Sequence, residues 1–147
     1  MDDLEQMMEF KAQGFSCSQV ILKMALEMQG KENPDLIRAM QGLAGGLGYT
    51  GDVCGGLTGA VCMLGLYAGR GLPEEEDEPR LMFMIEDLLK WFKQEYGVPC
   101  GGIHCENLVG QDRKKVAEIC PNLIAATYQR AKELLVENGF DLSASDR

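Results

Sequence analysis

Basic residues are scarce in this sequence. Lysine and arginine together number 14, against 23 aspartate and glutamate residues, so the formal net charge is −9 at pH 7. A protein that binds nucleic acid needs cations to neutralise the phosphate backbone, and an anionic membrane surface attracts basic segments in the same way. The composition therefore predicts no nucleic-acid partner and no attachment to an anionic membrane.

The sequence also lacks a segment typical of export or of membrane insertion. Residues 1–6 read M-D-D-L-E-Q and contain neither the basic nor the apolar region of a signal peptide. The apolar run 53–69 has only the shortest length that spans a bilayer, and nearly a third of it is glycine. We interpret it as a buried helix with no membrane insertion, and we expect a cytoplasmic protein.

No strand pattern, internal repeat or low-complexity segment is visible, and 147 residues suffice for one domain. Residues 39–69 contain a single charged residue, Asp52, and a water-soluble protein must bury such a run on all sides. We predict an all-α fold, a single-domain irregular bundle of about six helices around a central helix at 52–69. The domain should cover residues 1–139, and 140–147 should form a polar C-terminal tail that frays.

Local signals mark the start of several helices. Ser16 and Gln19 have the spacing of a capping box, which makes Cys17 the first residue of a helix. Asn33, followed by proline, is typical of another helix start. Asp52 is placed to accept hydrogen bonds from the first free amides of the central helix.

Further helices are expected toward the C-terminus. Proline opens an apolar-faced helix at 79–97, and this face is interpreted as core. Asp112 should cap a short helix that ends at Ile119. Cys120 and Pro121 should then begin the last helix, because proline favours the first turn.

The chain has six cysteines but no Cys-x-x-Cys pair. It therefore lacks the usual signature of a thioredoxin-type site and of a zinc ribbon. Cysteines in a reducing compartment are more often buried inert residues, metal ligands or redox groups than structural disulfides. The sequence alone leaves these three interpretations open.

Four of the cysteines, Cys17, Cys54, Cys105 and Cys120, are predicted at or beside the start of a helix. Unpaired amides and the helix dipole favour a thiolate there, and both a nucleophile and a metal ligand need the thiolate. We take Cys54 as the centre of the function and expect it to have a low pKa.

The other candidates carry less information. Cys62 is expected in the middle of the central helix as a small core residue. Cys100 lies in a glycine-rich loop and is either a resolving thiol or incidental. His104, the one histidine, is either a ligand, a base or neither.

The sequence resembles the C_GCAxxG_C_C family of small bacterial and archaeal redox-active proteins, which is named for four shared cysteines. The likeness runs from residue 14 to about residue 128, and its core is Cys-Gly-Gly-Leu-Thr-Gly at 54–59. The family usually has alanine where this chain has Gly56. The segments 14–19, 103–110 and 119–121 match the other three cysteine regions. The resemblance implies a redox protein whose site residues are Cys17, Cys54, Cys105 and Cys120.

Three functions remain open. The first is thiol–disulfide chemistry by these four cysteines, as in a thiol–disulfide oxidoreductase, with a redox partner protein or a small thiol that the sequence does not identify. The second is a metal or iron–sulfur site with the same four cysteines as ligands. The third is a helical binding module without chemistry. The sequence names no cofactor.

Overall fold

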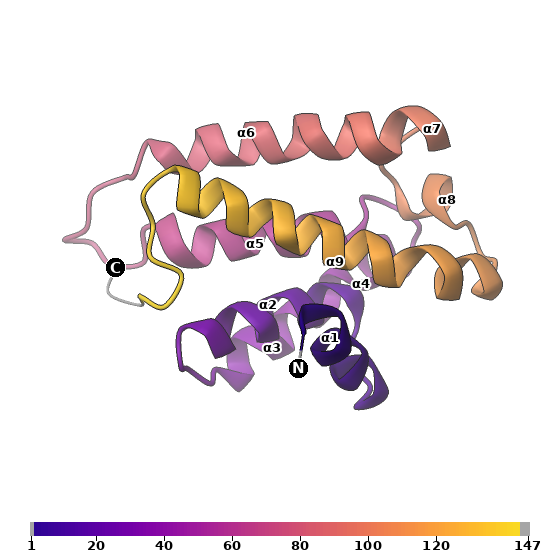
Figure 1. Ribbon diagram of the computed structural model, residues 1–147, viewed down its shortest axis with the longest axis horizontal. Helices are drawn as coiled ribbons and strands as arrows, with labels where there is room; N and C mark the ends of the chain where they lie inside the picture. Colours follow the sequence, from indigo (N-terminus) through magenta and orange to yellow (C-terminus); the bar gives the residue numbers. More distant parts are fainter. Residues whose placement is uncertain (1, 145–147) are drawn as a thin grey trace.

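The computed structural model describes residues 2–144. The helix α5 lies at the centre of the bundle and packs against α2 on one side and against α6 and α9 on the other (Figure 1). Their bounds are α1 Asp3–Ala12, α2 Cys17–Met28, α3 Pro34–Met40, the 3₁₀ turn η1 Gln41–Leu43, α4 Ala44–Leu47, α5 Gly55–Ala68, α6 Arg80–Phe92, the π-helical turn η2 Lys93–Gly97, α7 Val98–Cys100, α8 Cys105–Leu108 and α9 Arg113–Glu137. The all-α class and the irregular bundle are confirmed.

The central helix is buried, as its lack of charge predicted. Leu57, Ala60, Met63 and Leu64 are each at most 1 % exposed. The predicted start at Asp52 is wrong, because α5 begins at Gly55 with Cys54 as the residue before it. The Asp52 carboxylate instead accepts a hydrogen bond from the Val53 amide at 2.8 Å.

The helix starts in the N-terminal part agree with the sequence. Ser16 and Gln19 form the predicted capping box, in which the Ser16 amide donates to Gln19 Oε1 at 3.0 Å. Cys17 is consequently the first residue of α2. The Asn33 side chain caps α3 by accepting a hydrogen bond from the Leu36 amide at 3.1 Å.

The predicted break before Cys120 is wrong. Asp112 does cap a helix, accepting from the Lys114 amide at 2.9 Å, but that helix continues for 25 residues to Glu137. Pro121 lies inside α9, where its missing amide removes one hydrogen bond from the ladder. Burial of the second half of α9 against α5 outweighs this local loss. Cys120 therefore lies within a helix and not at its start.

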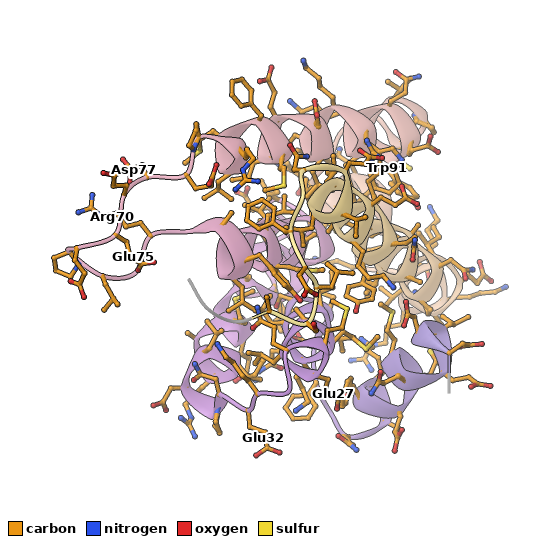
Figure 2. The ribbon with its side chains drawn as sticks, turned by 60° about the vertical axis from the view of Figure 1, so that its left-hand side comes forward. Glu27, Glu32, Arg70, Glu75, Asp77 and Trp91 are labelled. Atoms are coloured by element: carbon orange, nitrogen blue, oxygen red, sulfur yellow. The ribbon has the colours of Figure 1, made fainter. Side chains whose placement is uncertain are left out.

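The segment that joins α5 to α6 projects from the end of the bundle. It carries Arg70, Glu75 and Asp77, which Figure 2 shows away from the packed helices. Arg70 and Asp77 form an exposed ion pair at 3.8 Å. The acidic run 74–77 is thus mostly solvated, as expected.

Residues 140–144 fold back onto the bundle, in contrast to the fraying expected for this tail. The Tyr67 hydroxyl donates to the Leu142 carbonyl at 2.6 Å, and Gln29 Nε2 donates to the Ala144 carbonyl at 3.1 Å. The Arg80 guanidinium lies 4.3 Å from the centre of the Phe140 ring. Residues 145–147 of the predicted tail lie outside the described residues.

None of the described helices, α5 included, has the length and apolar character needed to cross a bilayer.

Candidate functional site

The starts of α2 and α5 meet through two glycines of α5. A Cβ atom at Gly55 would lie 2.7 Å from Cys17 Sγ and 2.8 Å from the Leu43 carbonyl oxygen. A Cβ at Gly59, one turn later, would lie 3.1 Å from Ser18 Cα. Carbon atoms normally pack at about 3.5–4.0 Å, so a side chain at Gly55 would overlap its neighbours and one at Gly59 would be tight. The glycine spacing therefore lets the Cys17 sulfur lie directly on the first turn of α5.

Cys54 is buried at that same turn, with 9 % of its surface exposed. Burial raises the pKa of its thiol to about 12, and the nearby Cys17 and Cys120 act in the same direction. Hydrogen bonding from the backbone at Leu57 and Gly56 lowers this pKa, but less than burial raises it. The expectation of a low pKa for Cys54 is therefore wrong, because the sequence shows the free amides and not the desolvation.

A short backbone pairing brings Cys105 to the site. Val53 and His104 form an antiparallel bridge, in which the Cys54 amide donates to the Ile103 carbonyl at 3.0 Å. The Cys105 amide donates to the Asp52 carbonyl at 2.7 Å. Cys105 then begins α8, as the sequence predicted. Burial, followed by the charge of Cys17, raises the pKa of the Cys105 thiol.

Cys120 reaches the same place from the middle of α9. Burial raises the pKa of its thiol to about 11, and Cys17 and Cys105 add to this effect. Lys11, at the end of α1, acts in the opposite direction. The charge of Cys17 therefore acts on all three of the other thiols. We call Cys17, Cys54, Cys105 and Cys120 the cysteine cluster.

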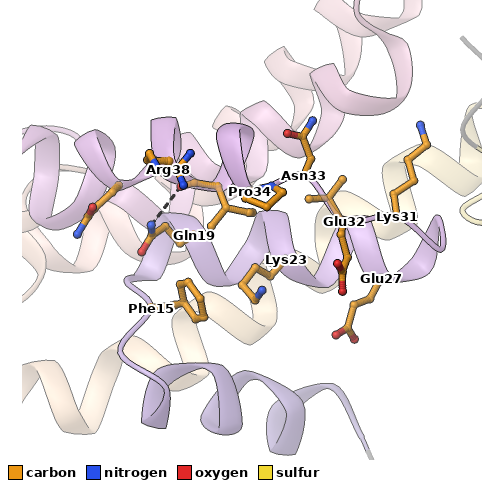
Figure 3. Close-up of a pocket in the computed structure, with 12 residues that line it drawn as sticks. Phe15, Gln19, Lys23, Glu27, Lys31, Glu32, Asn33, Pro34 and Arg38 are labelled. Atoms are coloured by element: carbon orange, nitrogen blue, oxygen red, sulfur yellow. Dashed lines mark hydrogen bonds between the residues drawn. The ribbon is translucent and has the colours of Figure 1, made fainter.

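Three members of the cysteine cluster line one open cavity. Its volume is about 440 Å³, and Cys17, Cys105 and Cys120 contribute to its wall, whereas Cys54 does not. A second cavity, of about 460 Å³, lies beside α2 and α3 and is lined by side chains such as Phe15, Lys23 and Arg38 (Figure 3). No cysteine lines it. The first cavity thus opens onto three of the four thiols of the site.

The remaining candidates lie apart from this cavity. Cys62 is half-buried in the middle of α5, and burial raises its pKa. Cys100 ends α7 and is exposed. The Nε2 atom of His104 lies 3.9 Å from Asp52 Oδ1, and His104 does not line the cavity.

All six cysteines are free thiols. Within residues 2–144, no group of three or more histidine, cysteine, aspartate or glutamate side chains has an arrangement that could hold a metal ion.

Sequence reasoning missed the rest of the cavity wall. Lys11, Tyr49 and Glu106 line it together with the three thiols. Nothing in their local sequence marks them, because α1, the glycine-rich segment 45–51 and α8 meet only in the folded chain. Of these three residues, only Tyr49 has a strained backbone, with a φ of 62°, and the sequence does not reveal it.

The profile of the C_GCAxxG_C_C family, described as "Putative redox-active protein", matches residues 15–134. The chain belongs to this family. A search of curated proteins found no match. A search of solved structures likewise found none. The match to the C_GCAxxG_C_C family spans all four members of the cysteine cluster and confirms the resemblance seen in the sequence.

Proposed function

We propose that the cysteine cluster performs thiol–disulfide exchange, with Cys17 as the attacking thiolate and Cys54 as the resolving thiol. The observation that carries the proposal is the contact at Gly55, which places the Cys17 sulfur against the helical turn that Cys54 begins. Membership of a family of redox-active proteins supports the same class of chemistry.

The roles follow from access and from the helix starts. Cys54 does not line the cavity, so the first attack on an outside disulfide falls to Cys17, Cys105 or Cys120. Among these, Cys17 is the first residue of a helix of 12 residues, where free amides stabilise a thiolate. Cys105 begins a helix of only four residues, and Cys120 lies within α9 with a pKa raised to about 11.

The reaction consists of two exchanges. The Cys17 thiolate attacks one sulfur of a substrate disulfide, whose S–S bond breaks, and the leaving thiolate takes a proton from water. Cys54 then attacks the Cys17 sulfur of the mixed disulfide, and its proton passes to the departing sulfur, which leaves as the second substrate thiol. Two electrons have passed to the substrate, and a Cys17–Cys54 disulfide has formed. A redox partner protein or a small thiol that supplies two electrons reverses the exchanges.

The test is to treat the reduced protein with bis(2-hydroxyethyl) disulfide under anaerobic conditions. We expect a fast loss of two thiols per chain and a linked Cys17–Cys54 peptide in the mass map, while the exposed Cys100 forms a separate mixed disulfide with the reagent. Cys54→Ser should stop the reaction at a mixed disulfide on Cys17, and Cys17→Ser should prevent the fast phase. Cys62→Ser is the matched control, because Cys62 lies in the middle of α5 and does not line the cavity.

A Cys17 thiol that stays free while the others react would contradict the proposal. Metal analysis and an absorption spectrum of the anaerobically purified protein form the second arm of the test. If the protein contains a stoichiometric metal ion or iron–sulfur cluster that is lost in Cys17→Ser, the cysteines are ligands of that group, and the proposal of thiol exchange is wrong.

A further inference from the structure

We infer that the substrate of this site is a small disulfide of the amino-acid type, one that carries a carboxylate and an ammonium group beside its sulfurs. The inference rests on the proposed thiol exchange and deepens it by naming the substrate class. The observations that carry it are the size of the cysteine cavity and the two charges on its wall.

The cavity limits the size of the substrate. Its volume of about 440 Å³ falls within the range of about 300–1,000 Å³ that is typical of small-molecule sites. Its wall comes from α1, the start of α2, the glycine-rich segment 45–51, α8 and α9. A disulfide buried in a folded protein is too bulky to fit in an open cavity of this size, whereas a disulfide of two amino-acid halves fits.

The wall carries one positive and one negative side chain. Of the residues that line the cavity, Lys11 and Glu106 are the two that are charged. Lys11 lies on the side of Cys120, because its charge lowers the pKa of that thiol. Glu106 lies against Gly51, where a Cβ atom would be 3.3 Å from Glu106 Oε2. In the described part of the chain, neither forms an ion pair within 4.0 Å. Lys11 is therefore available to a carboxylate, and Glu106 to an ammonium group.

Tyr49 adds an aromatic wall to the mouth of this cavity. Its side chain packs over Gly45, where any Cβ would overlap the ring, and 77 % of its surface is exposed. Its φ of 62° is uncommon for a residue with a side chain and persists only where the surrounding structure holds the backbone. An exposed ring held in this way gives the apolar stem of a ligand a surface to pack on.

The experiment compares four disulfides as substrates of the full chain. They are L-cystine with both charges, 3,3′-dithiodipropionate with carboxylates, cystamine with ammonium groups, and the neutral bis(2-hydroxyethyl) disulfide. We expect kcat/KM to be highest for L-cystine, and at least about tenfold above the neutral compound, which corresponds to about 1.4 kcal/mol.

Two substitutions test whether Lys11 and Glu106 cause the preference for charged disulfides. Lys11→Gln should lower the ratio of kcat/KM for dithiodipropionate to that for the neutral disulfide by about tenfold, the factor that corresponds to about 1.4 kcal/mol. Glu106→Gln should lower the corresponding ratio for cystamine. The ratio cancels any effect of Lys11 on the reactivity of the thiols. Lys90→Gln and Glu86→Gln are matched controls, because these two residues form an exposed ion pair on α6, outside the cavity.

The outcomes separate the inference from the proposed function. Equal kcat/KM for all four disulfides, or ratios that change as much in the control variants, would overturn the inference and leave thiol exchange standing. Failure of Cys17 to react with any of the four disulfides would overturn both.

Discussion

The contact between Gly55 and the Cys17 sulfur leads to a quantitative prediction. In Gly55→Ala the new Cβ would lie 2.7 Å from Cys17 Sγ and 2.8 Å from the Leu43 carbonyl oxygen. Both distances fall about 0.7–1.3 Å short of a normal packing separation. The Leu43 carbonyl belongs to the backbone, so the overlap can be removed only if α2 and the chain before α4 move away from α5.

The expected cost is the difference between two effects. Overpacking of this kind costs about 1–3 kcal/mol, whereas alanine stabilises a helix by up to about 1 kcal/mol over glycine. With the full helical gain subtracted, we expect Gly55→Ala to lower the free energy of unfolding by up to about 2 kcal/mol. Formation of the Cys17–Cys54 disulfide should also slow, because the displaced sulfur no longer rests on the turn that Cys54 begins.

The matched control is Gly65→Ala on the same helix. A Cβ there meets no atom within 4 Å, so this variant keeps the helical gain of about 1 kcal/mol without the overlap. Urea unfolding followed by fluorescence of Trp91, the one tryptophan, gives both values. A Gly55→Ala protein as stable as Gly65→Ala would refute the reasoning from close packing.

Three further results are expected. Burial raises the pKa of Cys54 from 9.0 to about 12, so its thiol stabilises the folded state fully below pH 9, and this contribution should fall by at most about 1.4 kcal/mol per pH unit as the pH rises toward 12. The free energy of unfolding should therefore fall less steeply with pH in Cys54→Ala than in the wild type, and equal slopes would contradict the prediction. Tyr67→Phe should cost about 1 kcal/mol in urea unfolding, since the Leu142 carbonyl loses its 2.6 Å hydrogen bond, and an unchanged midpoint would count against the docked C-terminal segment. Gly56→Ala, which restores the usual family residue, should raise stability by up to about 1 kcal/mol, because the atom nearest to its Cβ is a Leu123 methyl at 3.3 Å, followed by Ile124 and Cys54 side-chain atoms at 3.6 Å. A loss of stability would show that Leu123 cannot yield.

Features that depend on neighbours in sequence were predictable. Ser16 and Gln19 lie one turn apart, so their capping box is visible in the sequence and fixes Cys17 as the start of α2. The same holds for Asn33 before Pro34, and for the uncharged run that became α5. Each of these signals acts over a few residues, where hydrogen bonding and polarity decide the outcome.

Features that depend on tertiary packing were not predictable. Pro121 is a sound signal for a helix start, yet burial of the following residues on α5 keeps α9 continuous through it. The backbone at Leu57 and Gly56 favours a Cys54 thiolate by hydrogen bonding, but burial of the thiol in the folded chain raises its pKa by more. Lys11 and Glu106 lie in ordinary solvent-facing sequence, and only the fold places them on the wall of the cysteine cavity.

The pairing of Val53 with His104 has a consequence for the order in which the protein matures. It joins stretches about fifty residues apart, and Cys120 arrives from further along still. A ribosome must therefore synthesise most of the polypeptide before these sulfurs can meet. A chain that ends before Cys105 would carry Cys17 and Cys54 without the wall that α8 and α9 supply, so the cavity can form only after these last helices are made.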